Sequence, residues 1–423
     1  MVSKFRPLPA LLKLNTRRVS SKEVFEKESK YAAHNYKPLP VALCKGKGIY
    51  VWDVEGKKYM DFLSGCSANN YGHCHPKIVS TIQRQVGILH HTSRAFYNDV
   101  LGEYCEKITK LFGYDKVLPM NTGVEANDTA CKLARKWGYT KKRIPVNQAK
   151  IIFCKENFFG RSLAAISAST DPLSFEGFGP YMPGFHFVPY NDLPELEKAF
   201  KDPTVCAFMM EPIQGDAGVI VPQDGYLQGV RKLCDKYNVL WIADEIQTGL
   251  GRTGKRVAVD YEEVKPDILV LGKALGGGVY PVSACLANDD VMLVIEPDTH
   301  GSTFGGNPLG SKVAITSLQV LEEERLAYNA TIMGAMFREA LRNSCDQKIL
   351  HVVRGKGLLN ATVINKNYGN AWDACLKLKA NGVIAKQTRE QTIRFSPPLV
   401  ITKIQMSEAI DIICKTINGL RRQ

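Results

Sequence analysis

A lysine follows an apolar, strand-like run and stands shortly before a glycine-rich stretch. The run is Ile268–Leu271, the lysine is Lys273, and Gly276–Gly278 comes soon after it. A lysine amine that is partly removed from water has a lowered pKa, and its neutral form can attack a carbonyl carbon to form an imine. A lysine that only extends its charged end into solvent is the alternative, but the glycines favour the close approach of a flat ligand.

A carboxylate follows a second apolar run. Val239–Ala243 leads directly into Asp244 and Glu245. An acid at the end of a buried strand is unfavourable unless a cation or hydrogen-bond donors partner it. The sequence leaves two interpretations of Asp244 open, a partner for a bound cation and a cap of the following turn.

Two segments have the composition of phosphate-binding loops. Asn121–Ala126 places Thr122 and Gly123 at an expected strand-to-helix junction, where free backbone N–H groups and a hydroxyl attract anions. Thr299–Pro308 is rich in small residues and hydroxyls, although an ordinary turn would have the same composition. A capped strand-to-helix turn is also the structural alternative for the first segment.

These features fit one cofactor better than they fit separate roles. Pyridoxal phosphate needs a lysine for its imine, an acid beside its ring nitrogen and a cradle for its phosphate. No G-x-G-x-x-G pattern follows a strand, and no G-x-x-x-x-G-K-[ST] pattern is present, which argues against dinucleotide and P-loop sites. The sequence therefore predicts a pyridoxal-phosphate site.

Short apolar runs alternate with helical stretches from about residue 77 onward. Two helical stretches, Ala126–Trp137 and Gly225–Tyr237, lie between strand candidates. The strand candidates are Lys116–Met120, Lys150–Cys154, Val205–Glu211, Val239–Asp244, Ile268–Leu271 and Val282–Ala287. This alternation predicts an α/β domain with a largely parallel sheet, whose active site lies beyond the carboxyl ends of its strands.

The segments on either side of this domain differ from it. Ile49–Val54 and Lys57–Phe62, joined by Glu55-Gly56, predict a hairpin. A long helix is expected to leave the domain near Glu322–Glu324, and the remainder is typical of a smaller α+β domain that packs with the first as one body. The expected divisions are a transit peptide (1–22), an N-terminal segment (23–66), a large cofactor-binding domain (67–327) and a C-terminal small domain (328–423).

The composition is that of an ordinary globular protein with a basic start. The 423 residues are 45% hydrophobic, and no run approaches the roughly 18 apolar residues of a membrane span. The first 22 residues hold six lysines and arginines, several leucines and serines, and no acid. Such a start resembles a mitochondrial transit peptide, with a disordered basic tail as the alternative. The other basic residues are scattered, so the net charge of +13 does not indicate nucleic-acid binding.

The twelve cysteines include no C-x-x-C pair. His73-Cys74-His75 is the one cluster with metal-ligating side chains, but neighbours on a strand face opposite ways and no second ligand pair stands at a zinc-like spacing. We therefore expect no metal site and reduced thiols.

Several longer motifs match those of a known family. They are His34–Tyr36, Tyr71–Pro76, Ala243–Gly249 and Leu271–Leu275, together with Ser93–Tyr97 and Arg394–Leu399. From about Tyr31 to Ile417 the chain resembles the class III pyridoxal-phosphate-dependent aminotransferases of fold type I, and the last two motifs are typical of their ornithine-using branch. The resemblance implies a large domain with a mainly parallel seven-stranded sheet, a smaller α+β domain and a homodimer.

The resemblance also implies roles around the cofactor. Lys273 would form the imine and transfer the proton between the substrate carbon and the cofactor, and Asp244 would pair with the pyridinium nitrogen. The other cofactor-binding residues that the family implies are Gln247 at the ring hydroxyl, Phe158 on the ring face, Gly123 and Val124 at the phosphate, and Thr303 and Ser302 reaching that phosphate from the other subunit.

A further set of residues would bind substrate. In the family pattern Tyr36 and Arg161 hold the end of ornithine that does not react. Arg394 would bind the α-carboxylate of glutamate or 2-oxoglutarate, because its planar fork matches a carboxylate.

The chain departs from the family pattern in the substrate pocket. Asp216 stands where the ornithine branch has a glutamate that masks the arginine, and it is one methylene shorter. Cys66 stands where a substrate-shaping tyrosine is usual, and Tyr71 stands where glutamine is usual. The loss of an aromatic wall enlarges the pocket unless Tyr71 refills it, so we expect weaker discrimination between ornithine and other ω-amines.

The resemblance implies transfer of the δ-amino group of L-ornithine to 2-oxoglutarate in the mitochondrial matrix. The alternatives are a related ω-aminotransferase with another amine donor, such as 4-aminobutyrate, and a non-catalytic paralogue that serves as a scaffold. Nothing would maintain Lys273 and Asp244 in a scaffold, and both are present.

Overall fold

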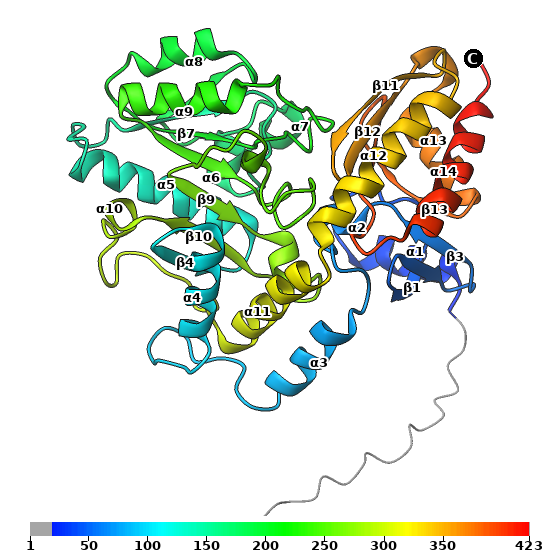
Figure 1. The fold of residues 1–423 in the computed structure, drawn as a ribbon, viewed down its shortest axis with the longest axis horizontal. Helices are drawn as coiled ribbons and strands as arrows, with labels where there is room; N and C mark the ends of the chain where they lie inside the picture. Colours follow the sequence, from blue (N-terminus) through cyan, green and yellow to red (C-terminus); the bar gives the residue numbers. More distant parts are fainter. Residues whose placement is uncertain (1–18, 423) are drawn as a thin grey trace, which may run out of the picture.

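A seven-stranded sheet forms the centre of the larger part of the computed structural model, which describes residues 19–422 (Figure 1). Its strands, in spatial order, are β4 (Lys116–Met120), β10 (Ser283–Ala287), β9 (Ile268–Leu271), β8 (Leu240–Asp244), β7 (Val205–Met210), β5 (Lys150–Cys154) and β6 (Phe185–Val188). β10 runs antiparallel to both of its neighbours, and the other pairs are parallel. The predicted mainly parallel α/β fold is confirmed.

Helices cover both faces of this sheet, which explains the continuous apolar runs of its central strands. In β8, Trp241 and Ala243 join one buried cluster while Leu240 and Ile242 join another on the opposite face. The helices of this part are α3 (Pro76–Gln85), α4 (Leu101–Phe112), α5 (Gly123–Thr140), α6 (Leu163–Ser167), α7 (Pro172–Phe175), α8 (Leu193–Phe200), α9 (Tyr226–Tyr237), α10 (Asp289–Met292) and α11 (Pro308–Glu323), with short 3₁₀ turns η1 (Ala258–Tyr261) and η2 (Lys273–Gly276).

All six strand candidates correspond to strands, and the edge strand β6 was not predicted. β6 has only four residues and three of them are partly or largely exposed, so it lacks the continuous apolar run that marks the central strands. Both predicted helices are present, within α5 and as α9.

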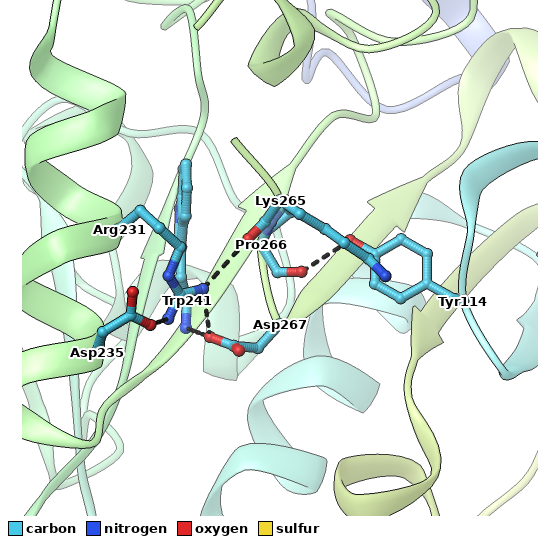
Figure 2. A network of polar contacts seen from close by, with 7 residues as sticks. All are labelled: Tyr114, Arg231, Asp235, Trp241, Lys265, Pro266 and Asp267. Atoms are coloured by element: carbon cyan, nitrogen blue, oxygen red, sulfur yellow. Dashed lines mark hydrogen bonds and ion pairs between the residues drawn. The ribbon is translucent and has the colours of Figure 1, made fainter. Parts of the chain in front are cut away.

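A polar network joins the amino ends of β8 and β9 to α9 and to the segment before β4 (Figure 2). Asp267 accepts hydrogen bonds from the backbone N–H of Trp241 at 2.7 Å and from Nη1 of Arg231 at 2.9 Å. Tyr114 donates its hydroxyl to the carbonyl oxygen of Pro266 at 2.8 Å. The network fixes the end of these strands that lies away from Asp244.

A smaller antiparallel sheet and three helices form the opposite side of the molecule (Figure 1). The sheet has the order β11 (Leu350–Lys356), β12 (Leu359–Ile364), β15 (Thr392–Phe395) and β14 (Lys386–Arg389), and the helices are α12 (Leu326–Ser344), α13 (Ala371–Ala380) and α14 (Lys403–Asn418), with a 3₁₀ turn η3 (Lys366–Tyr368). The helix expected across Glu322–Glu324 is two helices, because α11 ends at Glu323 and Arg325 adopts a left-handed φ of 51° before α12.

The N-terminal segment and the C-terminal part share a third sheet. Its strands are β1 (Leu43–Lys47), β2 (Tyr50–Asp53), β3 (Lys58–Asp61) and β13 (Val383–Ile384). The predicted hairpin is confirmed as β2–β3, and β13 pairs in parallel with β3. This pairing brings the turn after β3, labelled α2 (Ser64–Ser67), next to the C-terminal part. The domain limits stay a prediction.

The described chain begins shortly before α1 (Ser21–Tyr31), whose first turn is capped by Ser20. The expected transit peptide therefore lies outside the described residues except for its last four. Between residues 19 and 422, no helix is long and apolar enough to cross a membrane.

Candidate active site

A cavity of about 270 Å³ lies at the carboxyl ends of the central strands, the edge at which parallel sheets form active sites. Its lining residues are Cys66, Gly123, Val124, Asn127, Phe158, Phe159, Gly160, Glu211, Asp216, Asp244, Ile246, Gln247, Lys273 and Arg394. We call Asp244, Lys273 and the start of α5 its large-sheet side, and Cys66 and Arg394 its small-sheet side. The structure thus brings most of the predicted site residues together.

Asp244 ends β8 and is buried in the wall of the cavity. Its Oδ2 accepts a hydrogen bond from Nδ2 of Asn127 at 2.7 Å, and its Oδ1 accepts one from the N–H of Ile246 at 3.0 Å. Burial raises the pKa of Asp244, whereas the two hydrogen bonds and the charge of Lys273 lower it. The side chain therefore caps the following turn and also lines the cavity, where a cation would stabilise its charged form.

Lys273 opens the 3₁₀ turn after β9 with a left-handed φ of 44°, a strained conformation for a residue with a side chain. Its amine forms no hydrogen bond or ion pair with any residue from 19 to 422. Burial lowers the pKa of Lys273, and the nearby charge of Arg394 lowers it further. Both effects favour the neutral form of the amine, which is the form that attacks a carbonyl carbon.

The first turn of α5 presents backbone donors to the same cavity. Thr122 and Glu125 form a capping box, in which Glu125 accepts a hydrogen bond from the N–H of Thr122 at 2.6 Å. The N–H groups of Gly123 and Val124 have no acceptor among the described residues. A Cβ at Gly123 would lie 2.9 Å from Cδ1 of Ile246, so glycine allows the helix end to pack against the residues after Asp244. Free N–H groups at the start of a long helix favour an anion.

The small-sheet side of the cavity is built around a buried arginine. Arg394 lies in β15, and its Nη2 donates a hydrogen bond to Sγ of Cys66 at 3.2 Å. Asp216 lines the same cavity but forms no ion pair with Arg394 in the described part of the chain. A guanidinium in this position is suited to a substrate carboxylate.

Residues 31–417 match the family described as aminotransferase class-III. The chain belongs to the class-III aminotransferases. It is therefore an enzyme of the transaminase class, and the resemblance expected from its motifs is confirmed.

Named relatives of this class-III aminotransferase are ornithine aminotransferases. The chain is 65% identical to the mitochondrial ornithine aminotransferase of Drosophila melanogaster, over 94% of this chain and 92% of the relative. It is 62% identical to the mitochondrial enzyme of Rattus norvegicus, over 94% and 91%. A solved structure of the ornithine aminotransferase from Toxoplasma gondii, described as having partial occupancy of PLP at the active site, matches with a TM-score of 0.94 and 47% identity, over 96% and 95% of the two chains.

Two polar lining residues of this aminotransferase were missed by the sequence analysis. Glu211 accepts hydrogen bonds from the N–H groups of Phe158 at 2.9 Å and Gly215 at 3.1 Å, and Asn127 holds Asp244. Burial raises the pKa of Glu211 to about 8, with a contribution from the charge of Asp244. Glu211 ends a predicted strand as Asp244 does, so the same signal would have found it.

Two predicted substrate residues do not line the cavity. Tyr36 is exposed, with Nζ of Lys386 5.8 Å from the centre of its ring. Arg161 donates a hydrogen bond to Ser174, and its guanidinium lies 5.2 Å from the ring centre of the lining residue Phe158. Arg161 is therefore beside the cavity wall, whereas Tyr36 lies elsewhere.

The two residues expected from the other subunit also lie outside the cavity of their own chain. Oγ of Ser302 accepts a hydrogen bond from Nδ2 of Asn121 at 2.8 Å, and Thr303 is exposed. Their roles at the phosphate stay a prediction.

Tyr71 does not refill the space left by an aromatic wall at Cys66. It is only 1% exposed, belongs to the main hydrophobic cluster and is absent from the cavity lining. Gln247, by contrast, lines the cavity and donates its Nε2 to the carbonyl oxygen of Cys66 at 3.2 Å.

Proposed function

We propose that this aminotransferase transfers the δ-amino group of L-ornithine to 2-oxoglutarate, with pyridoxal 5′-phosphate as cofactor, giving L-glutamate 5-semialdehyde and L-glutamate. The observation that carries the proposal is a single cavity lined by Lys273 and Asp244 from the large sheet and by Arg394 from the small one. Similarity to the ornithine aminotransferases of fly and rat over 94% of the chain supports the choice of amine donor.

The residues present fit this cofactor. The amine of Lys273 has no partner in the described chain, and Oδ1 of Asn127 is buried without one. The N–H groups of Gly123 and Val124 are free at the start of an 18-residue helix, as a phosphate requires. A buried carboxylate with a raised pKa, Asp244, would gain from a cationic ring nitrogen.

Several lining residues then have a defined task. When bound, pyridoxal phosphate supplies an aldehyde that receives the amino group and a ring that withdraws electrons. Asp244 would accept a hydrogen bond from the ring nitrogen and keep it protonated. The N–H groups of Gly123 and Val124 would bind the phosphate, while Gln247 contacts the ring hydroxyl and Phe158 the ring face.

Lys273 would also move the proton. Because burial lowers its pKa, more of the amine is neutral near neutral pH than for an exposed lysine. In the first half-reaction Nζ would take a proton from the δ-carbon of ornithine. In the second it would deliver one to the α-carbon of the amino acid formed from 2-oxoglutarate.

Arg394 would bind the α-carboxylate of 2-oxoglutarate and of the product glutamate. A guanidinium can hold a carboxylate by two parallel hydrogen bonds, which also orients the α-carbon toward the reacting amine. Arg161, which lies beside the cavity wall, would hold the unreactive end of ornithine, so the two substrates would use different anchors.

We also propose a homodimer in the mitochondrial matrix. Thr303 is exposed and lies outside the cavity of its own chain, as a residue that completes the partner's phosphate site would. The basic, acid-free start of the sequence and the mitochondrial names of the relatives in fly and rat support the location. Small molecules are the expected substrates, with no nucleic acid or membrane partner.

Isotope transfer tests the reaction directly. L-Ornithine labelled with ¹⁵N at the δ-nitrogen is incubated with the holoenzyme and 2-oxoglutarate, and glutamate is analysed by mass spectrometry. We expect the label in glutamate, and none when only the α-nitrogen is labelled. Label transfer from the α-nitrogen alone, or from neither position, would contradict the proposal. Lys273→Ala is the matched inactive control.

The contact between Cys66 and Arg394 favours one second candidate, an ω-aminotransferase that also uses 4-aminobutyrate. Because Arg394 has no ion pair with Asp216, it can bind the carboxylate of an ω-amino acid in the first half-reaction. We expect ornithine to be preferred by less than about a hundredfold in kcat/KM, a difference of about 2.7 kcal/mol. A larger preference would exclude this second activity.

A further inference from the structure

Arg394 has one side-chain partner in the described chain, and that partner is a thiol. The arginine is 5% exposed, its Nη2 donates to Sγ of Cys66 at 3.2 Å, and its Nε is buried without a hydrogen-bond partner. Asp216 borders the same cavity but does not pair with it in residues 19–422. A buried guanidinium with one weak acceptor and an unused donor is incompletely satisfied.

The backbone that carries Cys66 adopts an unusual conformation. Four consecutive residues, Ser64 to Ser67, have positive φ values of 50°, 55°, 57° and 72°, and only Gly65 adopts this region without strain. Such a conformation persists only where the surroundings impose it. The position of the Cys66 sulfur is therefore determined by contacts outside the turn.

Two of these contacts come from Asp61, at the end of β3. Its Oδ1 accepts hydrogen bonds from the N–H groups of Leu63 at 2.8 Å and Ser64 at 2.9 Å. Its Oδ2 pairs with Nε2 of His73 at 2.8 Å, which fixes the carboxylate. Asp61 therefore stabilises the start of the left-handed turn.

The strand that carries Arg394 is joined to the same turn. Ser396, two residues after the arginine, donates its N–H to the carbonyl oxygen of Phe62 at 2.7 Å and its hydroxyl to that of Leu63 at 3.0 Å. Gln247 holds the carbonyl oxygen of Cys66 from the large-sheet side. The sulfur and the guanidinium are thus placed in contact by the backbones on which they stand.

We propose that Cys66 is a specificity-determining residue that holds Arg394 through its sulfur until a substrate carboxylate takes its place. The carboxylate of a dicarboxylic acid or an ω-amino acid would then displace a weak sulfur acceptor instead of a competing carboxylate such as Asp216. The inference deepens the proposed function, since it concerns how the same cavity selects between its substrates.

The chemistry gives different expectations for two substitutions at this position. Cys66→Ala removes the acceptor, so a substrate carboxylate no longer has to displace it. Cys66→Ser keeps an acceptor of similar size that can still receive the hydrogen bond from Arg394. The pair of variants separates the loss of the contact from the loss of the thiol.

The first test measures binding of glutarate, a five-carbon dicarboxylate without a keto group, to the holoenzyme by titration calorimetry. We expect Cys66→Ala to bind glutarate about threefold to tenfold more tightly than the unchanged protein, the range of one hydrogen bond. Cys66→Ser should bind close to the unchanged protein. Cys44→Ser, at an exposed cysteine outside the cavity, is the control. Equal or weaker binding by Cys66→Ala, or equal shifts in the Ala and Ser variants, would overturn the proposal.

A second readout does not depend on a substitution. Iodoacetamide labels cysteines, and mass spectrometry follows the rate at Cys66 and at Cys44 in the holoenzyme. Glutarate at saturation should slow labelling of Cys66 and leave Cys44 unchanged. Glutarate that fails to bind, or that binds without slowing Cys66, overturns the assignment.

The outcome can be separated from that of the proposed function. If these two tests succeed and no δ-nitrogen of ornithine reaches glutamate, the amine donor is wrong and the role of Cys66 stands. If the nitrogen is transferred but glutarate binding does not depend on Cys66, the proposed donor is correct and the role proposed for Cys66 is wrong.

Discussion

The two sides of the cavity are built in different ways. On the large-sheet side, Asp244 is the last residue of the buried strand β8, Lys273 stands two residues after β9, and Gly123 opens the helix that follows another strand. On the small-sheet side, Cys66 and Arg394 are 328 positions apart and meet because the N-terminal hairpin joins the C-terminal part through β13. The first arrangement is local in the sequence and the second depends on tertiary pairing.

This difference suggests a division of labour. In the proposed function, the residues positioned by the ends of the parallel sheet would perform the amino transfer. The small-sheet side is made by two distant segments, one of which is a strained left-handed turn. A side chain there, such as Cys66, can therefore differ without disturbing the large-sheet side. Substitutions on the two sides should therefore impair the enzyme in different ways.

The largest effect is expected on the large-sheet side. Lys273→Ala should lower turnover by more than about 10³-fold, because a positioned proton-transfer group and the covalent anchor are both lost. The thermal midpoint should remain close to that of the unchanged protein, since the amine has no partner among residues 19–422. Steady-state rates with L-ornithine and thermal unfolding measure both quantities, and retained turnover would contradict the assignment of Lys273.

Asp244→Asn should act on the same side with a smaller effect. The amide cannot supply the negative charge that keeps a ring nitrogen protonated, so turnover should fall by about 10²–10³-fold. Because Lys273 is retained, the substituted protein should still bind the cofactor, although less tightly. Cofactor affinity and kcat measured together check this, and an unchanged kcat would exclude a role for the charge.

A substitution on the small-sheet side should change KM more than kcat. Asp61→Ala removes the acceptor for two N–H groups of the turn that carries Cys66, a loss of about 2–3 kcal/mol in stability. The KM for 2-oxoglutarate should change by up to about tenfold while kcat changes less. Asp53→Ala, in β2 and outside the cavity, is the matched control, and equal kinetic effects of both would remove the link to the cavity.

The smallest effect concerns the pH dependence of stability. Burial raises the pKa of Glu211 from 4.5 to about 8, so the folded protein binds this proton more tightly than the unfolded chain does. Between those pH values the folded state holds more protons, and stability therefore falls as pH rises. Glu211→Gln should flatten this decline in cofactor-free protein, as measured by the free energy of unfolding from pH 5 to pH 8. An equal slope in Glu211→Gln and in the unchanged protein would contradict the shift.

The residues of the large-sheet side could be predicted from the sequence because each of them stands next to a recognisable strand end. Asp244, Lys273 and Gly123 needed only the apolar runs before them and the general rule for parallel sheets. Asn127 was missed because its role depends on the direction of a helical side chain one turn into α5.

The small-sheet side could not be derived in this way. The Cys66–Arg394 contact depends on the β3–β13 pairing and on the left-handed turn, and neither leaves a periodic pattern in the sequence. For the same reason Tyr71, five residues beyond Cys66, was considered for the pocket although it is buried in the core. The residues beside strand ends could therefore be predicted from the sequence, whereas the contacts of the substrate-binding residues could be seen only in the folded structure.

One measurement tests the central claim, that the large-sheet side performs amino transfer while the small-sheet side chooses the donor. The holoenzyme is mixed with L-ornithine or with 4-aminobutyrate in the absence of an acceptor, and the visible absorption of the bound cofactor is followed in a single turnover. We expect loss of the band with ornithine, a slower loss with 4-aminobutyrate, and none with either donor in Lys273→Ala. Protein that binds the cofactor but changes its band with neither amine would contradict the claim.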